Sequence, residues 1–555
     1  MKITSIPQLY RNVNRWGEVV SVLSKYGLAN WVSRLDFDFV KGLFRDADGE
    51  VLAKHSPEAR VRLALNELGP TFIKLGQILS TRPDLVGVEL AAELQQLQSD
   101  VRADPPAAVR KTIERELGLP VEQAFLEFDE TPLASASIGQ VHRARLQTGE
   151  RVVIKVQHTG IDEKVRVDLD ILAGLAQMAE TVPEFVNYRP QATVAEFQRT
   201  LLRELDFGRE ARHMQQFAQD FAGDPRIHIP RWLPELSTSR VLTMELLEGI
   251  KLCERARLTA AGYDLAELAR RGAELYLAMI FTNGFYHADP HPGNILVLPG
   301  GVIGLLDFGM VGRIDEPLRE LIEEMLSAVV HADADHLTSI ITRIGSTPPQ
   351  LDYAGLSIDV ADFIAHYAHL RIDELELGGA LNEMIEIIRR YHIMLPARIA
   401  MLIKVLVMLE GASRMLNPHF SLVELMRPYQ RKMFFRRLSP GRQLRRLRRL
   451  YSELEHLAEV LPRGVVDILQ QVQSGSFDIH LDHRGLEPSV NRLVLGMLAS
   501  ALFLGSSWLL ANNVGPSIPY VNLSFLGTAG STVSIMLGLR LLRAITKSGH
   551  LDRRK

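Results

Sequence analysis

Three side chains with metal-binding oxygen atoms lie close together in the chain. Asp289 and Asn294 are five positions apart in "NGFYHADPHPGNILV", and Asp307 follows eighteen positions after Asp289 in "LLDFGMVG". Such oxygens suit magnesium, which takes its remaining ligands from water and phosphate. The spacing of His287 and His291 also raises the possibility of a zinc site. The prolines beside His291 disfavour it, because they prevent the helix that would align the two rings. The stretch therefore favours magnesium and phosphate chemistry.

A lysine in a predicted strand is the candidate phosphate contact. Lys155 lies in "VVIKV", and an ammonium among apolar residues should enter a site or pair with an acid, because its burial alone is costly. Upstream, "ASASIGQV" has the spacing of the kinase Gly-rich loop, with alanines at two glycine positions, which should stiffen the loop. The loop residues expected to contact nucleotide are Ala134, Ser135, Ala136, Ser137, Ile138, Gly139 and Val141.

The segment "RELDFGREARHM" offers three acids, Glu204, Asp206 and Glu210, as partners for Lys155. The alternative is that these are exposed acids on a helix surface.

The order of the motifs is that of protein kinases: the loop, the lysine, the acid, Asp-x4-Asn and Asp-Phe-Gly follow one another. Protein kinases usually carry Arg before the first aspartate and Lys two positions after it. This chain has Ala288 and His291 there.

Composition limits the remaining possibilities. The chain has 555 residues and a net charge of −3, which gives no general argument for nucleic-acid binding. Its one cysteine, Cys253, excludes an intramolecular disulfide and a cysteine-cluster metal site. A mean hydropathy of +0.03 with 23% charged residues is high for a soluble protein and points to an apolar segment.

That segment is residues 493–539, which contain no Lys, Arg, Asp, Glu or His. Residues 493–511 and 521–542 are each long enough to cross a bilayer, and prolines and a glycine lie between them. A buried helical hairpin in a soluble core is the alternative. Basic residues lie before the first span and at and after the end of the second, from Arg540 onward, and none lies between the spans, so the positive-inside rule predicts that both ends are cytoplasmic.

A basic segment, "RKMFFRRLSPGRQLRRLRRL" (431–450), precedes the apolar one. Basic residues next to a membrane segment attract anionic headgroups. RNA binding and a solvated helix face are the alternatives, and the nearby spans favour membrane contact.

The pattern along the chain predicts an α+β, protein-kinase-like two-lobe fold with an N-terminal helical extension and a C-terminal transmembrane helical hairpin. The expected parts are a helical extension (1–130), a mixed lobe with a helical insertion (131–249), a helical lobe with the catalytic and metal motifs (250–430), a basic membrane-proximal segment (431–490) and two transmembrane helices (491–542). Within 131–249, strands are expected at 132–157 and 226–249. After residue 250 only "NILVL" and "VIGLLDF" are expected to be strands.

These motifs resemble the UbiB family of atypical kinases over nearly the whole chain. The family's distinguishing Lys-x-Gly-Gln motif is present as Lys74, Gly76 and Gln77 in "TFIKLGQILSTRPDLVG". The alanine-rich loop, "ELDFGREA", "HADPHPGN" and "DFG" match in order. His213 stands where many members carry Asn, a difference expected to have little effect.

The resemblance implies a role for each site residue. Lys155 would contact phosphates and pair with Glu210, Asp289 would act at the reacting group, and Asn294 and Asp307 would ligate magnesium. Met244 would lie behind the adenine, with Glu245 and Leu246 on the hinge. The helix with Lys74 and Gln77 would cover the peptide-binding side, held by Glu204 and Asp206.

The resemblance also implies an ATPase that uses ATP and Mg²⁺ in the cytoplasmic (inner) membrane and supports ubiquinone (coenzyme Q) biosynthesis by handling lipophilic precursors. Expected partners are anionic lipids, prenylated quinone precursors, other biosynthetic proteins and a second copy in a homodimer; no nucleic acid is expected. A phosphotransferase acting on a lipid, small molecule or protein, and an ATP-binding scaffold, are the alternatives.

Overall fold

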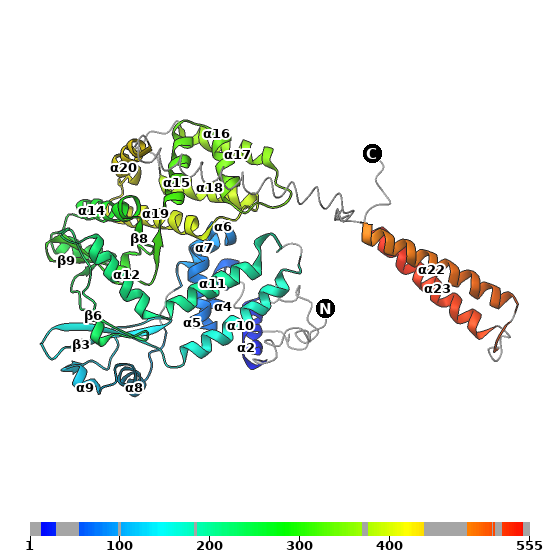
Figure 1. The fold of residues 1–555 in the computed structure, drawn as a ribbon, viewed down its shortest axis with the longest axis horizontal. Coiled ribbons are helices and arrows are strands. Elements are labelled where there is room, and N and C mark those ends of the chain that lie inside the picture. The colour runs from blue at the N-terminus through cyan, green and yellow to red at the C-terminus, as the bar shows by residue number, and fades with distance from the viewer. Residues whose placement is uncertain are drawn as a thin grey trace, which may run out of the picture. The chain divides into compact units, whose positions relative to one another are not determined.

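The computed structural model describes residues 13–28, 55–97, 101–182, 186–368, 376–437, 486–512, 514–516 and 524–547. The chain divides into two compact units, Met1–Ser439 and Pro440–Lys555 (Figure 1). Residues 438–485, most of the basic segment, lie outside the described residues, as do the basic residues of the last eight positions.

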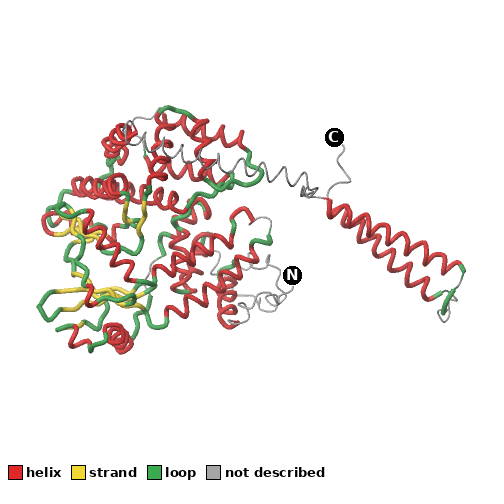
Figure 2. The backbone as a smooth tube through the Cα atoms, in the orientation of Figure 1, coloured by secondary structure: helices red, strands yellow, loops and turns green. Residues whose placement is uncertain are grey.

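The first unit contains a five-stranded antiparallel sheet with the order β1-β3-β4-β6, in which β2 also pairs with β3. Strands are drawn in yellow in Figure 2. The predicted hairpin is formed by β3 (Gly139–Arg145) and β4 (Arg151–Gln157), with Val141 opposite Lys155. Val152, Ile154 and Val156 of β4 are buried, as β-branched residues on one face of a pleated strand should be. The other strands are β1 (Glu127–Phe128), β2 (Ala134–Ser135) and β6 (Val241–Glu245).

Helices precede this sheet, as expected for the N-terminal region. The helix α4 begins after Ser56, whose hydroxyl accepts a hydrogen bond from the Ala59 N–H, and ends at Gly69, where φ is +95°. The chain then turns directly into α5. The helices are α2 (Val13–Lys25), α4 (Pro57–Leu68), α5 (Pro70–Leu79), α6 (Pro83–Val86), α7 (Val88–Leu94), α8 (Pro106–Leu117) and α9 (Val121–Ala124).

Three helices connect β4 to β6: α10 (Ile161–Ala179), α11 (Pro190–Glu204) and α12 (Phe207–Asp220). α10 and α11 pack against each other and against α5 (Figure 1). Asp206 caps α12 by accepting a hydrogen bond from the Gly208 N–H, which starts a new helix axis only two residues after α11 ends. α12 packs against β6, so its first turns lie under the sheet.

The region after residue 226 is mostly helical and holds two small sheets. The four-stranded sheet has the order β5-β10-β9-β7, and a separate pair joins β8 to β11. The strands β9 (Ile295–Leu298) and β10 (Val302–Leu305) match the two predicted runs, whereas β7 (Ile250–Lys251), β8 (Phe285–His287) and β11 (Val311–Arg313) were not predicted. The predicted strand region at 226–249 holds only β5 (Ile227–His228) and β6. Each unpredicted strand has two or three residues, too few to show an alternating pattern.

The helices of this region are α13 (Arg255–Ala260), α14 (Leu265–Leu277), a π-helix (Ala278–Asn283), α15 (Glu316–Val330), α16 (Ala334–Ile344), α17 (Tyr353–Ala368), α18 (Leu377–Arg390), α19 (Ala397–Leu416) and α20 (Leu422–Arg437). α19 packs against α14, α18 and β11. Its orientation matters for the site because β8 leads into the Asp289 motif and β11, which pairs with β8, follows the Asp-Phe-Gly motif.

The second unit contains α22 (Leu486–Ala511) and α23 (Phe525–Lys547), which lie side by side (Figure 1). Leu493–Ala511 and Phe525–Arg543 are long and apolar enough to cross a membrane, and only 6% and 11% of their residues are buried. Gly527 and Gly530 lie where the helices meet: an added Cβ would come within 3.0 Å of Leu510 and Ser506. Small residues at a helix contact are typical of helix pairs in lipid.

Candidate active site

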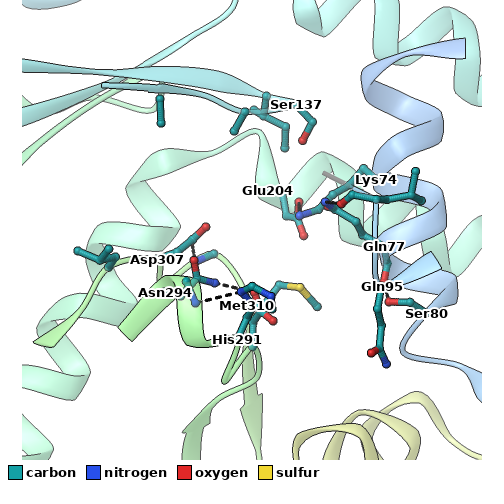
Figure 3. A pocket seen from close by; sticks show the side chains of 18 of the residues that line it. Lys74, Gln77, Ser80, Gln95, Ser137, Glu204, His291, Asn294, Asp307 and Met310 are labelled. Carbon is teal, nitrogen blue, oxygen red and sulfur yellow. Dashed lines mark hydrogen bonds and ion pairs between the residues drawn. The ribbon is translucent and has the colours of Figure 1, made fainter. Parts of the chain in front are cut away.

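One cavity of about 1170 Å³ collects most of the predicted site residues (Figure 3). Its walls come from α5, the β2–β3 loop, β4, α12, and the segments that carry the two magnesium motifs. The predicted residues that line it are Lys74, Gln77, Ala134, Ala136, Ser137, Ile138, Gly139, Val141, Lys155, Glu204, Glu210, Met244, Asp289, Asn294 and Asp307. Gly76, Ser135, Asp206, Glu245 and Leu246 are not on these walls.

Lys155 is held from two sides. Its Nζ lies 2.8 Å from Glu210 Oε2 and 3.9 Å from Asp307 Oδ1. Desolvation opposes its charge, but the carboxylates of Asp307 and Glu210 together raise the pKa of Lys155. Glu210 also accepts a hydrogen bond from the Phe308 N–H at 3.3 Å. The pair therefore joins β4, α12 and the Asp-Phe-Gly segment.

The three candidate magnesium and catalytic residues meet at this cavity. Asn294 Nδ2 donates to Asp289 Oδ2 at 2.7 Å, so the two residues five apart in sequence are in contact across the loop. Asp307 Oδ1 accepts from the Gly309 N–H at 2.8 Å. The charge of Lys155 lowers the pKa of Asp307 against desolvation, which keeps this carboxylate ionised.

Two histidines hold the backbone of the Asp-Phe-Gly segment. His287, which is fully buried, accepts the Asp289 N–H at Nδ1 and bonds the Asp307 carbonyl through Nε2. His213 bonds the Phe308 carbonyl at 2.9 Å. The sequence raised a zinc site with His287 and disfavoured it, and it predicted little effect from having His213 in place of Asn. In the structure both rings position the backbone of this segment.

The alanine-rich loop is held by hydrogen bonds to its own hairpin and to the residue that follows it. Ala136 N–H donates to the Gly139 carbonyl at 2.8 Å, and the His158 ring bonds the Ala136 carbonyl at 2.9 Å. A Cβ on Gly139 would lie 2.4 Å from the Val156 carbonyl oxygen, so this position needs glycine. His158 was not among the predicted residues.

The Lys-x-Gly-Gln motif lies on α5 and faces the same cavity. Lys74 Nζ is 2.7 Å from Glu204 Oε2, and both side chains are largely buried. Gln77 donates to the Leu97 carbonyl at 3.3 Å. A Cβ on Gly76 would lie 2.2 Å from Leu97 Cδ1, so glycine allows the segment after α7 to approach α5 closely.

Asp206 has other contacts than the predicted ones. Its carboxylate caps α12 at Gly208 and contacts Arg212 at 3.3 Å, and among the described residues no bond joins it to the Lys74 helix. Glu204 ends α11 and Asp206 precedes α12, so the change of helix axis between them separates two acids that are neighbours in sequence.

The predicted hinge residues line an adjoining cavity of about 920 Å³. Met244, which is buried, contributes to both cavities, whereas Glu245 and Leu246 contribute only to the second. Glu245 is 3.0 Å from His228 Nε2 and accepts the Arg231 N–H at 3.1 Å. The carboxylate of Glu245 is therefore bonded to β5 and to the segment that follows it.

Sequence reasoning also missed Lys404 on α19, which lines the main cavity and is only 9% exposed. The sequence did contain a signal for it: Lys404 is a single lysine inside the apolar run "IAMLIKVLVML", just as Lys155 is a single lysine inside an apolar strand.

A small antiparallel sheet with a Lys–Glu pair, next to a mostly helical region with Asp-x4-Asn and Asp-Phe-Gly at one cavity, defines a protein-kinase-like fold with mixed helix and strand content. Three family models match: an ABC1 atypical kinase-like domain at residues 96–341, a UbiB helical domain at 360–421 and an ABC1/UbiB kinase-like C-terminal domain at 479–547.

Curated relatives match over most of the chain. An uncharacterized protein in the hydrogenase 1 5′ region of Clostridium pasteurianum is 31% identical over 97% of this chain and 100% of that protein. A probable protein kinase UbiB of Xanthomonas campestris is 34% identical over 80% of this chain and 82% of its own length. Among solved structures, the Rv3197–erythromycin complex of Mycobacterium tuberculosis is 25% identical, with a TM-score of 0.47 over 68% of this chain and 97% of that one. The chain belongs to the UbiB family of atypical kinases, which confirms the prediction from its motifs.

Proposed function

We propose that the chain is a membrane-anchored, kinase-like ATPase that binds Mg-ATP and supports ubiquinone biosynthesis. The observation that carries the proposal is the Lys155–Glu210 ion pair beside Asp307, in the cavity that also holds Asp289 and Asn294. Membership of the UbiB family supports kinase-type chemistry and a role in ubiquinone biosynthesis.

The residues of the candidate active site fit magnesium and a nucleoside triphosphate. The Asn294 amide nitrogen is occupied by Asp289, which leaves the Asn294 carbonyl oxygen for a metal, and Gly309 holds one oxygen of Asp307. Magnesium needs few protein ligands when phosphates provide the others. Bound magnesium would neutralise charge on the phosphates.

The remaining residues would place the nucleotide and the reacting group. Lys155, oriented by Glu210, would contact the α and β phosphates beneath the loop from Ala134 to Val141, and Met244 would lie behind the adenine, with Glu245 and Leu246 on the hinge. Asp289, oriented by Asn294, would accept a proton from the attacking water or acceptor.

The α5 segment would decide which acceptors can enter. Lys74 and Gln77 line the cavity, and the Lys74–Glu204 pair anchors α5 to the end of α11. A protein substrate would have to displace this buried pair. We therefore assign Lys74, Gly76, Gln77 and Glu204 a regulatory role in excluding peptides, and propose that Asp206 acts only through the start of α12.

We also propose a membrane location for the second unit. The exposed apolar surfaces of α22 and α23 would form a transmembrane hairpin with both ends in the cytoplasm, and the kinase-like region would form two lobes on that side. The proposed parts are the helical extension (1–130), the mixed lobe (131–249), the helical lobe (250–430), the basic membrane-proximal segment (431–490) and the two transmembrane helices (491–542). The proposed partners are anionic headgroups, prenylated quinone precursors, other ubiquinone-biosynthesis proteins and a second copy of the chain.

The test is phosphate release from ATP by the detergent-solubilised protein, with and without anionic liposomes and a prenylated phenol. Release that lipid raises and Asp307→Asn abolishes supports the proposal. Unchanged activity in lipid contradicts the membrane coupling. Wild-type protein that binds ATP without turnover would instead favour the scaffold.

A phosphotransferase acting on a lipid, small molecule or protein is the second candidate. The cavity extends past the predicted nucleotide residues to Arg62, Asn66 and Gln95 on or after α4 and α7, which leaves room for an acceptor. Mass spectrometry of the same reactions distinguishes the two, because only a phosphotransferase yields a phosphorylated phenol, lipid or peptide.

A further inference from the structure

Lys404 is an unusual cation for its surroundings. It lies in the middle of α19, and only 9% of it is exposed. It makes no hydrogen bond or ion pair with any described residue, yet it lines the main cavity together with Met408, one turn later on the same helix. An ammonium with little exposure and no partner costs free energy unless an anion binds it.

The orientation of α19 is fixed by contacts on its other sides. Glu410, also buried, accepts the N–H groups of Leu377 and Gly378 at the start of α18, at 3.3 and 2.5 Å. Arg398 pairs with Asp315 at 2.9 Å near the other end of the helix. The acid on α19 is therefore occupied elsewhere, and Lys404 is held at the cavity wall.

The other buried cations of the cavity already have partners. Lys155 is paired with Glu210, and Lys74 is paired with Glu204. Desolvation lowers the pKa of Lys404, the charge of Asp289 raises it and that of Lys74 lowers it further, which places Lys404 within electrostatic reach of both residues.

The catalytic loop lacks a cation of its own. Protein kinases usually carry a lysine two residues after the catalytic aspartate, whereas this chain has His291, whose Nδ1 accepts the Gly293 N–H at 3.1 Å. A phosphoryl group next to Asp289 therefore has no lysine from the loop to balance its charge.

We propose that Lys404 binds the terminal phosphoryl group of the nucleotide. Lys404 lies on α19 and would replace the lysine that protein kinases carry in the loop, at the position of His291. This inference rests on the proposed Mg-ATP site and adds a contact to it. Because ADP lacks the terminal group, Lys404 would discriminate ATP from ADP.

The test is Lys404→Met in the full-length, detergent-solubilised chain, with Mg-ATP and Mg-ADP binding measured by calorimetry on the hydrolysis-deficient Asp289→Asn background. A charge-assisted hydrogen bond to phosphate predicts that ATP affinity falls about tenfold or more, while ADP affinity changes less than about twofold. Lys404→Arg keeps the charge and should recover part of the ATP affinity. Lys251→Met, at an exposed lysine of the same cavity, is the matched control and should leave the ATP-to-ADP ratio unchanged.

A second readout checks folding. Removal of an unpaired buried charge predicts that nucleotide-free Lys404→Met unfolds at the same or a higher temperature than the parent. Equal loss of ATP and ADP affinity, or no loss of either, would overturn the inference and leave the nucleotide site intact. Failure of the parent protein to bind ATP would overturn both proposals.

Discussion

Lys74 on α5 and Glu204 at the end of α11 form an ion pair of 2.7 Å at the wall of the candidate active site. The two residues are 130 positions apart, and both side chains are mostly buried. Desolvation opposes the charge, but Glu204 raises the pKa of Lys74 overall. The pair therefore connects the N-terminal helices to the nucleotide cavity.

Glu204→Gln should lower the free energy of unfolding by about 3 kcal/mol, because it leaves the Lys74 ammonium buried without its counter-charge. Chemical denaturation of the full-length protein measures the loss. Lys74→Met combined with Glu204→Gln should recover part of it, since the stranded charge is then gone. Lys25→Met, at the exposed Lys25–Glu67 pair, is the control and should have little effect. An effect as large for Lys25→Met as for Glu204→Gln would contradict this explanation.

Asp307→Asn should reduce ATP turnover by at least about 100-fold, because the neutral amide is a poorer magnesium ligand and no longer balances Lys155. Steady-state phosphate release measures the effect, and circular dichroism confirms the fold. Since Lys155 holds the pKa of Asp307 below its usual range, wild-type turnover should not be lost near pH 4 to 5 through protonation of this carboxylate. Activity of Asp307→Asn close to wild type would exclude the assigned metal role.

His142 should make stability depend on pH. Gln140 donates to His142 Nε2 at 2.8 Å, and His142 Nδ1 bonds the Asp129 carbonyl at 2.8 Å, an arrangement that requires a neutral ring. Desolvation lowers the pKa of His142, so the unfolded chain takes up its proton first. The contribution of neutral His142 to the free energy of unfolding is fully present above the unfolded-state pKa of about 6.5 and is lost as the pH falls below that value.

Thermal unfolding between pH 7.5 and 5.5 checks this prediction. His142→Asn keeps a donor for the Asp129 carbonyl but cannot take up a proton. The variant should be less stable at pH 7.5 and should lose less stability on acidification than wild type. Parallel pH profiles for the two proteins would show that other groups, such as His213, cause the dependence.

Leu498→Arg should impair membrane insertion of α22. Leu498 is 62% exposed on this helix, and an arginine at the centre of a span costs about 2.5–3.5 kcal/mol. Alkaline carbonate extraction of membranes separates inserted from peripheral protein, and Leu498→Ala is the matched control. Extraction of the wild-type chain by carbonate would contradict a transmembrane role for this helix.

The local elements and the identities of the motif residues followed from the sequence. The β3–β4 hairpin was visible because two seven-residue strands, the second rich in β-branched residues, flank a short turn, and the two apolar helices because they lack charge over a long run. The spacing of Asp289, Asn294 and Asp307 is local enough to be recognised directly. The family followed from the order of these motifs.

Only the tertiary structure decided which distant side chains meet. The residue pattern alone left Glu204, Asp206 and Glu210 as equivalent candidates, and only the family resemblance separated them. In the structure the turn from α11 to α12 places Glu204 at Lys74, Asp206 at a helix cap and Glu210 at Lys155. Lys404 reached the cavity through the packing of α19, which no local pattern encodes. Sequence periodicity reports how each segment partitions between water and core, whereas ion pairs depend on orientations that exist only after those segments pack together.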